Sequence, residues 1–199
     1  HAFDIRDPAN PVLVGEFDPD LGIVNDAVLD GSTLRVVGMA FDRATFEGVG
    51  FVAGFDVDAL WSGTRANTGP PAEALAVHAG VTYVATAPDP HEPFAHSAGA
   101  PPGLGIYRGT QRLGSLATLG MVTGVAVSDR NAVLAAGATG LVVFDVADPW
   151  SPVQVGAADT PGFAARIASE GDFALLADGA RDVLVYEISD PRRPRALGR

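Results

Sequence analysis

Short apolar segments separated by polar turns recur along the whole chain. In the clearest case, residues 125–127 and residues 132–135 are apolar, and a polar turn at 128–131 joins them. Segments of this length indicate buried strands, because an amphipathic helix needs about ten residues or more. The same strand–turn–strand pattern is present at 26–37, 75–85 and 166–176. Residues 141–146 instead alternate between two faces, with Leu141, Val143 and Asp145 on one side. The pattern predicts antiparallel β-hairpins.

A nine-residue phrase occurs three times, at 3–11, 144–152 and 186–194. Each copy has an aromatic residue, an acid and a β-branched residue, continues as Asp-Pro-x-x-Pro, and leads into an apolar run that ends at Gly. The aromatic positions are Phe3, Phe55, Tyr107, Phe144 and Tyr186, with spacings of 52, 52, 37 and 42 residues. Four strands in a unit of about 40 residues is typical of a β-propeller blade. A β-sandwich would not repeat its turns so faithfully, and a β-helix has much shorter coils.

We therefore expect an all-β protein, a β-propeller built of four-stranded antiparallel blades. Residues 1–199 would form a single propeller domain or segment, with a partial blade at 2–17 and blades at about 22–68, 72–118, 121–158 and 162–199. About four and a half blades are visible, so we expect the segment to be part of a larger ring. More of the same polypeptide, or another chain, would complete that ring.

The Asp-Pro-x-x-Pro phrase has a structural explanation. An Asp at the first position of a turn accepts hydrogen bonds from the backbone that follows it, and the adjacent Pro fixes φ near −65°. The second Pro would lie at the start of an outer strand, where the loss of an N–H is tolerated. We predict that the phrase forms the hairpin between the third and fourth strands of a blade and is not a catalytic site.

The phrase resembles the LVIVD repeat. The aliphatic strand 141–146, then Asp148-Pro149, Pro152-Val153 and the segment around Gly156, carry the resemblance. It is close over 141–199 and fair over 2–17, whereas the segment at Phe55 lacks the Pro pair and the segment at Tyr107 also lacks the acids. The resemblance implies a β-propeller of a bacterial or archaeal secreted or surface protein, mostly without a known activity. The motif is structural, so it carries over no functional residues.

Composition excludes several kinds of function. The net charge is −11, so we expect no nucleic-acid partner, because a negative surface repels phosphate backbones. No apolar stretch approaches the length of a membrane span, so none is expected in this segment. The chain has no Cys, which excludes disulfides and thiolate chemistry and suits an oxidising compartment. We expect an extracytoplasmic location: secreted, periplasmic or at the cell surface.

Two long connections are candidates for function. Residues 39–50 and residues 87–103 join second to third strands, so both are expected on the same face of the propeller. The first contains Asp42, Arg43 and Glu47, which we consider ligand-binding candidates. The second contains His91, Glu92 and His96, whose imidazole and carboxylate groups could ligate a divalent metal. A solvated polar loop is the alternative. No other cofactor is expected.

The inner strands give a second candidate site, at the mouth of the central channel. Alignment of these strands places Asp26, Leu75, Val125 and Arg166 in one column. Asp26 and Arg166 would either line the channel or be paired in the core, because an isolated buried charge is costly. Asn25 precedes Asp26 and would join a polar cluster there. Trp61 and Trp150 lie on turns at the other face, and we expect them to pack between blades.

These features predict a non-catalytic extracytoplasmic module that binds a protein or carbohydrate surface or acts as a scaffold. We assign no catalytic residue. The alternative is a metal-dependent or metal-binding propeller, either a lactonase-like hydrolase or an oxidoreductase, with its centre at the channel mouth. Bound stoichiometric metal would favour that alternative.

Overall fold

The structure is a computed structural model that describes residues 2–4, 6–15, 22–41, 48–56, 63–87, 102–118, 120–179 and 182–198. In these residues all regular structure is β-strand, and the strands form one two-stranded and four four-stranded sheets. This confirms the expected all-β fold of four-stranded antiparallel blades. No helix long and apolar enough to cross a bilayer is found among them.

The strands follow one another in the order of the sequence. The small sheet consists of β1 (Ala2–Asp4) and β2 (Val12–Gly15). The first full sheet contains β3 (Ile23–Asp30), β4 (Thr33–Phe41), β5 (Gly48–Asp56) and β6 (Gly63–Gly69). The second contains β7 (Ala72–His78), β8 (Val81–Thr86), β9 (Gly103–Arg108) and β10 (Gln111–Ala117). The third contains β11 (Gly124–Ser128), β12 (Asn131–Ala135), β13 (Leu141–Asp145) and β14 (Val153–Ala158). The fourth contains β15 (Ala164–Glu170), β16 (Phe173–Asp178), β17 (Asp182–Glu187) and β18 (Arg195–Gly198).

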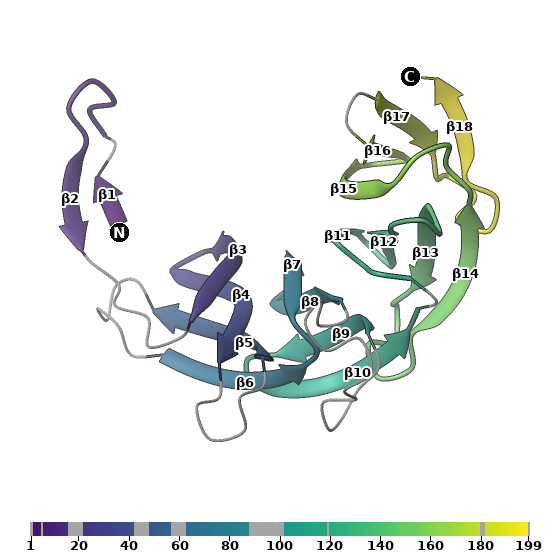
Figure 1. Cartoon of the computed structure of the whole chain (residues 1–199). Helices are drawn as coiled ribbons and strands as arrows, with labels where there is room; N and C mark the ends of the chain where they lie inside the picture. Colours follow the sequence, from purple (N-terminus) through teal and green to yellow (C-terminus); the bar gives the residue numbers. More distant parts are fainter. Residues whose placement is uncertain are drawn as a thin grey trace.

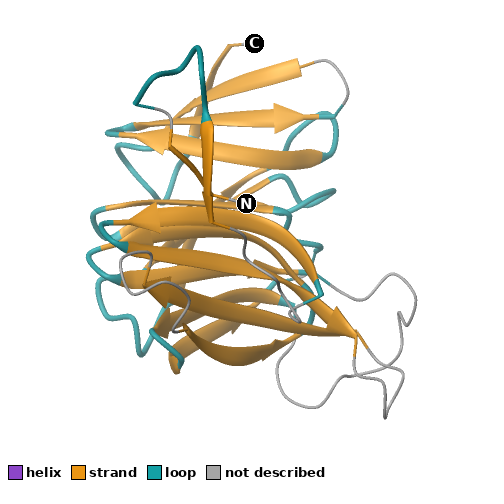
Figure 2. Ribbon diagram, turned by 90° about the vertical axis from the view of Figure 1, so that its left-hand side faces the viewer, coloured by secondary structure: helices purple, strands orange, loops and turns teal. Residues whose placement is uncertain are grey.

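The four full sheets are arranged as an arc, with the first strand of each sheet inside and the fourth outside (Figure 1). Contacts join β3 to β7, β7 to β11 and β11 to β15 along the inner edge. Figure 2 shows the strands of successive sheets side by side, with teal turns at both ends of the blades. The arc is open between the β1–β2 hairpin and the sheet β15–β18 (Figure 1).

The core lies between successive sheets. Between the second and third sheets, Tyr83 and Ile106 pack in one cluster with Leu134 and Phe144. Between the third and fourth, Val133 and Leu141 pack with Leu176 and Leu184. A smaller cluster joins the first and second sheets. Each sheet therefore covers one face of its neighbour, and burial of this apolar surface holds the arc together.

Two-residue turns connect the first and second strands of each blade. The pairs Asp30↔Thr33, His78↔Val81, Ser128↔Asn131 and Glu170↔Phe173 close these turns. The first turn residue has a positive φ in all four: Gly31 (60°), Ala79 (50°), Asp129 (45°) and Gly171 (54°). Positive φ at this position matches the twist of a tight hairpin. Glycine adopts it without strain, whereas Ala79 and Asp129 do not.

The Asp-Pro-x-x-Pro phrase forms the turn between the third and fourth strands, as predicted. Asp148 Oδ1 accepts a hydrogen bond from Trp150 N at 3.0 Å, and Asp190 Oδ1 accepts one from Arg192 N at 3.1 Å. Asp7 Oδ1 accepts the equivalent bond from Ala9 N at 3.1 Å. The carboxylates thus stabilise the turns. Trp150 itself is 56% exposed, so the expectation that it packs between blades was wrong. Trp61 lies outside the described residues.

Candidate functional site

The two long connections fall mainly outside the described residues. Asp42, Arg43 and Glu47, together with His91, Glu92 and His96, are all in this group, so their assignment as ligand-binding and metal-binding residues stays a prediction. Their anchor points are described. The strands β4 and β8, which lead into the two connections, end at the same edge of their sheets, because both start at equivalent two-residue turns. The described strand ends that lead into the two connections therefore lie on one face of the arc.

Asn25 and Asp26 join the first blade to the second. Asn25 Nδ2 donates a hydrogen bond to Ala72 O at 3.0 Å. Asp26 Oδ2 accepts one from Leu75 N at 2.9 Å, and its Oδ1 accepts the N–H of Ala27 at 2.9 Å. The acceptor and donor on the second blade are backbone groups of the neighbouring inner strand. Both side chains therefore link the two blades through hydrogen bonds.

Arg166 and Thr123 form a similar tie between the third and fourth blades. Thr123 Oγ1 donates to Ala165 O at 2.8 Å or to Ala164 O at 3.2 Å. In return the Arg166 guanidinium donates to Thr123 O. Its Nη1 also donates to Ala165 O at 3.3 Å. Arg166 is exposed at the inner edge of the arc, so the rest of its guanidinium faces solvent.

The alignment of inner strands made from the sequence was wrong in two blades. Counted back from the turn, the residues equivalent to Asp26 and Arg166 are Ala74 and Gly124, which pair with Ala85 and Ala135. Leu75 and Val125 are one residue later and are buried in the clusters between blades. A shift of one residue moves a side chain to the opposite face of a strand. At the inner edge, Ala74 and Gly124 therefore take the positions at which the sequence alignment had placed Leu75 and Val125.

Glu73 is an inner-edge acid that the sequence reasoning missed. The ladder skips Asn25, Glu73 and Ala165, which lie at equivalent bulges of β3, β7 and β15. Burial raises the pKa of the Glu73 carboxyl, and the positive charge of Arg166 opposes this with a smaller effect. A bulge cannot be recognised from the strand pattern, because that pattern assumes continuous pairing.

Threonines and one buried acid stabilise the connections between blades. Thr68 Oγ1 donates to Pro70 O and Thr118 Oγ1 donates to Gly120 O, both at 2.9 Å. In the last blade Thr160 Oγ1 donates instead to Asp178 Oδ1 at 2.9 Å, and Asp178 Oδ2 accepts Gly162 N at 2.8 Å. Asp178 is 5% exposed, yet both carboxylate oxygens have partners. In all three connections a Gly or Pro follows the Thr within two residues, and this recurrence was a sequence signal for the connection.

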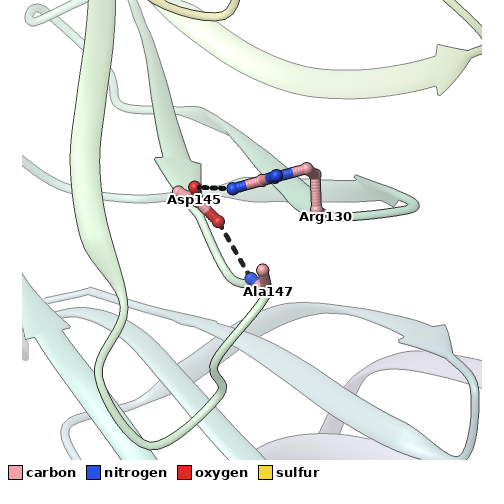
Figure 3. Close-up of polar contacts among 3 residues, drawn as sticks. All are labelled: Arg130, Asp145 and Ala147. Carbon is pink, nitrogen blue, oxygen red and sulfur yellow. Dashed lines mark hydrogen bonds and ion pairs between the residues drawn. The ribbon is translucent and has the colours of Figure 1, made fainter.

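Arg130 and Asp145 link two turns on the opposite face (Figure 3). Arg130 Nη2 lies 2.5 Å from Asp145 Oδ2, and Asp145 Oδ1 accepts the N–H of Ala147 at 3.0 Å. The hydrogen bond from Arg130 and, to a smaller extent, the bond from Ala147 lower the pKa of Asp145. The same turns are also joined through the backbone, where Val146 N donates to Arg130 O at 2.7 Å.

Within the described ranges, most of these polar side chains bind backbone atoms of the same protein. No group of three or more His, Cys, Asp or Glu residues that could hold a metal ion is found there. In the described part of the inner edge, most polar side chains therefore form hydrogen bonds between blades. Glu73 and the outer part of Arg166 are the groups there that could contact a ligand.

Comparisons with known proteins agree with this architecture. The family model of the LVIVD repeat matches residues 119–160 and residues 161–199, so the resemblance is confirmed for the last two blades. The solved structure of the computationally designed Ika4 protein is similar with a TM-score of 0.60 and 15% identity, over 88% of this chain and 94% of that one. The designed Ika8 protein gives a TM-score of 0.57 and 14% identity, over 84% of this chain and 46% of that one. Both are β-propeller-like designs, and at this identity they show the fold alone. No curated protein matches the chain.

Proposed function

We propose that this chain, a repeat β-propeller module with LVIVD repeats, is a non-catalytic binding or scaffold module that presents the connections at one end of its blades. The observation that carries the proposal is the use of the inner-edge polar side chains. Asn25, Asp26 and Thr123 each hydrogen-bond the backbone of the next blade. Side chains committed in this way build a rigid support and are poorly placed to move protons or bind a substrate.

The turn carboxylates support the same conclusion at the opposite face. Asp7, Asp148 and Asp190 each accept a backbone N–H of their own turn. A carboxylate with such a partner stabilises its turn, and a reaction at that carboxylate would break the hydrogen bond. In the repeats, the polar residues named above thus stabilise the fold. Recognition of a partner would then depend on the segments that differ between blades.

The recognition surface that we propose is the face from which residues 42–47 and 88–101 emerge. These segments join the second and third strands of two neighbouring blades at the same edge, so they can contribute to one surface for a protein or carbohydrate partner. Asp42, Arg43, Glu47, His91, Glu92 and His96 are the residues we expect to contact it. The extracytoplasmic setting is supported by the absence of Cys and by what the LVIVD resemblance implies about location.

Two loop-shortened variants test the proposal. In one, residues 42–47 are replaced by Asn-Gly, and in the other residues 88–101 are replaced in the same way. We expect both to keep the melting temperature of the parent chain, because the replaced segments lie between intact strands. Binding to a glycan array, or to intact cells of the source organism measured with fluorescently labelled chain, should fall at least about tenfold.

The enzyme alternative makes opposite predictions. Elemental analysis would then find stoichiometric metal in the purified chain, or an ester or lactone panel would show turnover. Metal binding or turnover that disappeared in His91→Ala or Asp26→Asn, while the fold remained intact, would overturn the proposed function. Unchanged binding in both loop-shortened variants would overturn it as well.

A further inference from the structure

The same hydrogen bond joins two pairs of neighbouring blades. Asn25 Nδ2 on the first blade donates to Ala72 O on the second, at 3.0 Å. Thr123 Oγ1 on the third blade donates to Ala164 O on the fourth at 3.2 Å, or to Ala165 O at 2.8 Å. Ala72 and Ala164 are equivalent, because each directly precedes the residue that the strand ladder skips. Both are 0% exposed, so a side-chain donor meets a buried residue in both contacts.

Glu73 lies at the same position in the contact between the second and third blades. The ladder skips Glu73 in β7 as it skips Asn25 in β3. The inner strand β7 contacts β11, as β3 contacts β7. An ionised carboxylate accepts hydrogen bonds and donates none, whereas the Asn25 amide and the Thr123 hydroxyl each have a donor. Glu73 therefore puts an acid where the other two contacts have a donor.

The acceptor that corresponds to Ala72 O and Ala164 O on the third blade is Val122 O. Gly124 and Arg166 are at the same distance from the turns of their strands, and Val122 and Ala164 lie two residues before them. Val122 is 0% exposed and packs in the cluster between the second and third sheets. Among the described residues no donor bonds its carbonyl oxygen. A buried carbonyl without a partner costs free energy, so this contact lacks a hydrogen bond that the other two have.

Protonation gives Glu73 the missing donor, because a carboxylic acid has one O–H. We propose that Glu73 is a proton-controlled link in the fold: its protonated carboxyl donates to Val122 O and joins the second blade to the third, and ionisation breaks this bond. The link goes beyond the proposed function and does not depend on it. The second blade is also the one whose sequence contains residues 88–101, so pH would act on the support of the proposed recognition surface.

The surroundings of Glu73 favour its protonated form. Burial raises the pKa of the Glu73 carboxyl above its ordinary value of 4.5, and the positive charge of Arg166 opposes this with a smaller effect. The Arg166 guanidinium itself donates to Thr123 O and Ala165 O. A group with a raised folded-state pKa contributes stability that is fully present below its unfolded-state pKa and is lost as the pH rises through its folded-state pKa. The link should therefore strengthen in acid.

The other titratable groups near β7 do not provide this effect. The strand β11 has none, and Tyr83 on β8 is neutral in acid, because burial raises its pKa above 10.0. Asp26 on β3 already accepts the N–H of Leu75. The remaining charged or titratable residues of β3, β4, β5 and β7 lie toward the opposite ends of these strands from Glu73, and they are Asp30, Arg35, Asp56 and His78.

Carbonyl ¹³C NMR tests the bond directly in the parent chain. The shift of the Val122 carbonyl should move with pH, with the same midpoint as the Glu73 carboxyl. In Glu73→Gln, whose amide donates at any pH, the Val122 shift should stay near its acid value. Glu73→Leu removes the charge without a donor, so there the Val122 shift should stay near its value at neutral pH. A Val122 carbonyl that does not respond to the titration of Glu73, or that is the same in the two variants, would overturn the proposal.

Melting temperatures of matched variants test the equivalence of the two positions. At pH 7 Glu73→Gln should melt about 2–4 °C above the parent, and the difference should disappear at about pH 3, where Glu73 has its own proton. Asn25→Asp places an acid in the first contact, so its loss in melting temperature at pH 7 should shrink by at least half at about pH 3. Asn25→Leu is the control, because its loss should not depend on pH. A gain in Glu73→Gln that persists in acid, or an Asn25→Asp loss that pH does not change, would contradict the proton-controlled link.

Discussion

Asp26 accepts a hydrogen bond from the backbone N–H of Leu75, with 2.9 Å between Oδ2 and N, and so connects the inner strands of two blades. Leu75 is 4% exposed, so its N–H has little access to water as an alternative partner. The acid that most resembled a channel ligand in the sequence is thus a structural residue of the first contact between blades.

Removal of this acceptor should destabilise the protein. We expect Asp26→Ala to lower the free energy of unfolding by about 1–3 kcal/mol, because the Leu75 N–H would be left buried without a partner. Asp26→Asn keeps an acceptor oxygen and should cost less than half as much. Urea denaturation measures both variants. Equal stability of the two variants would contradict a role for the hydrogen bond.

The stability of the protein at acidic pH should depend on the ionisation of Asp145. The hydrogen bond from Arg130, then that from Ala147, lowers the pKa of Asp145 below its ordinary value of 3.8. A carboxyl with a lowered folded-state pKa contributes stability above its unfolded-state pKa, and this contribution disappears as the pH falls through the folded-state pKa. The melting temperature of the parent should therefore fall more steeply than that of Asp145→Asn between about pH 4 and pH 2.

Arg130→Ala tests the cause of that shift. We expect the pKa of Asp145, followed by carboxyl ¹³C NMR, to rise toward 3.8 in this variant. Arg195→Ala is the control, because Arg195 pairs with Glu187 in the next blade. An Asp145 pKa that moves equally in both variants would show that general charge, and not the Arg130 hydrogen bond, sets it.

Two alanine substitutions at equivalent glycines should differ sharply. Gly156→Ala should cost about 1–3 kcal/mol, because the new methyl group would meet the backbone of Pro191 in the next blade. Gly198→Ala should change stability by no more than about 0.5 kcal/mol, because open space surrounds that position. Thermal unfolding of the two variants side by side provides the measurement. A large cost at Gly198 would mean that a turn already occupies it.

Turn residues offer a stabilising substitution. Ala79 has a φ of 50°, a conformation that is strained for any residue with a Cβ. Ala79→Gly should therefore raise the free energy of unfolding by about 0.5–1 kcal/mol. Gly31 has a φ of 60° in the equivalent turn, with no atom near an added Cβ, so Gly31→Ala should lower stability by a similar amount. Changes of the same sign in the two variants would rule out backbone strain as the cause.

The repeat determined much of the fold in advance. The phrase at 3–11, 144–152 and 186–194 predicted the turn between third and fourth strands, and the Asp hydrogen bonds confirm it. These are local interactions, made within four residues, so the sequence alone specifies them. The short apolar segments predicted the strands for the same reason, since each strand has the residues that its own hairpin needs.

The site was less predictable, because it depends on contacts between blades. Asn25 and Asp26 were recognised as polar residues of an inner strand, but their partners Ala72 and Leu75 are backbone groups on another sheet. Glu73 was missed because a bulge places it at the inner edge. A one-residue error in the alignment of Leu75 and Val125 was enough to assign the wrong face.

The sequence by itself determined the hairpins, their turns and the four-stranded repeat, because hydrogen bonds between neighbours in the chain fix them. Only the tertiary structure decided which face of each sheet is covered, which polar groups tie one blade to the next, and why Gly156 is filled while Gly198 is open. Those outcomes depend on how one sheet packs against another, across separations of 35 residues or more (Gly156 to Pro191 spans 191 − 156 = 35), and no local pattern encodes them.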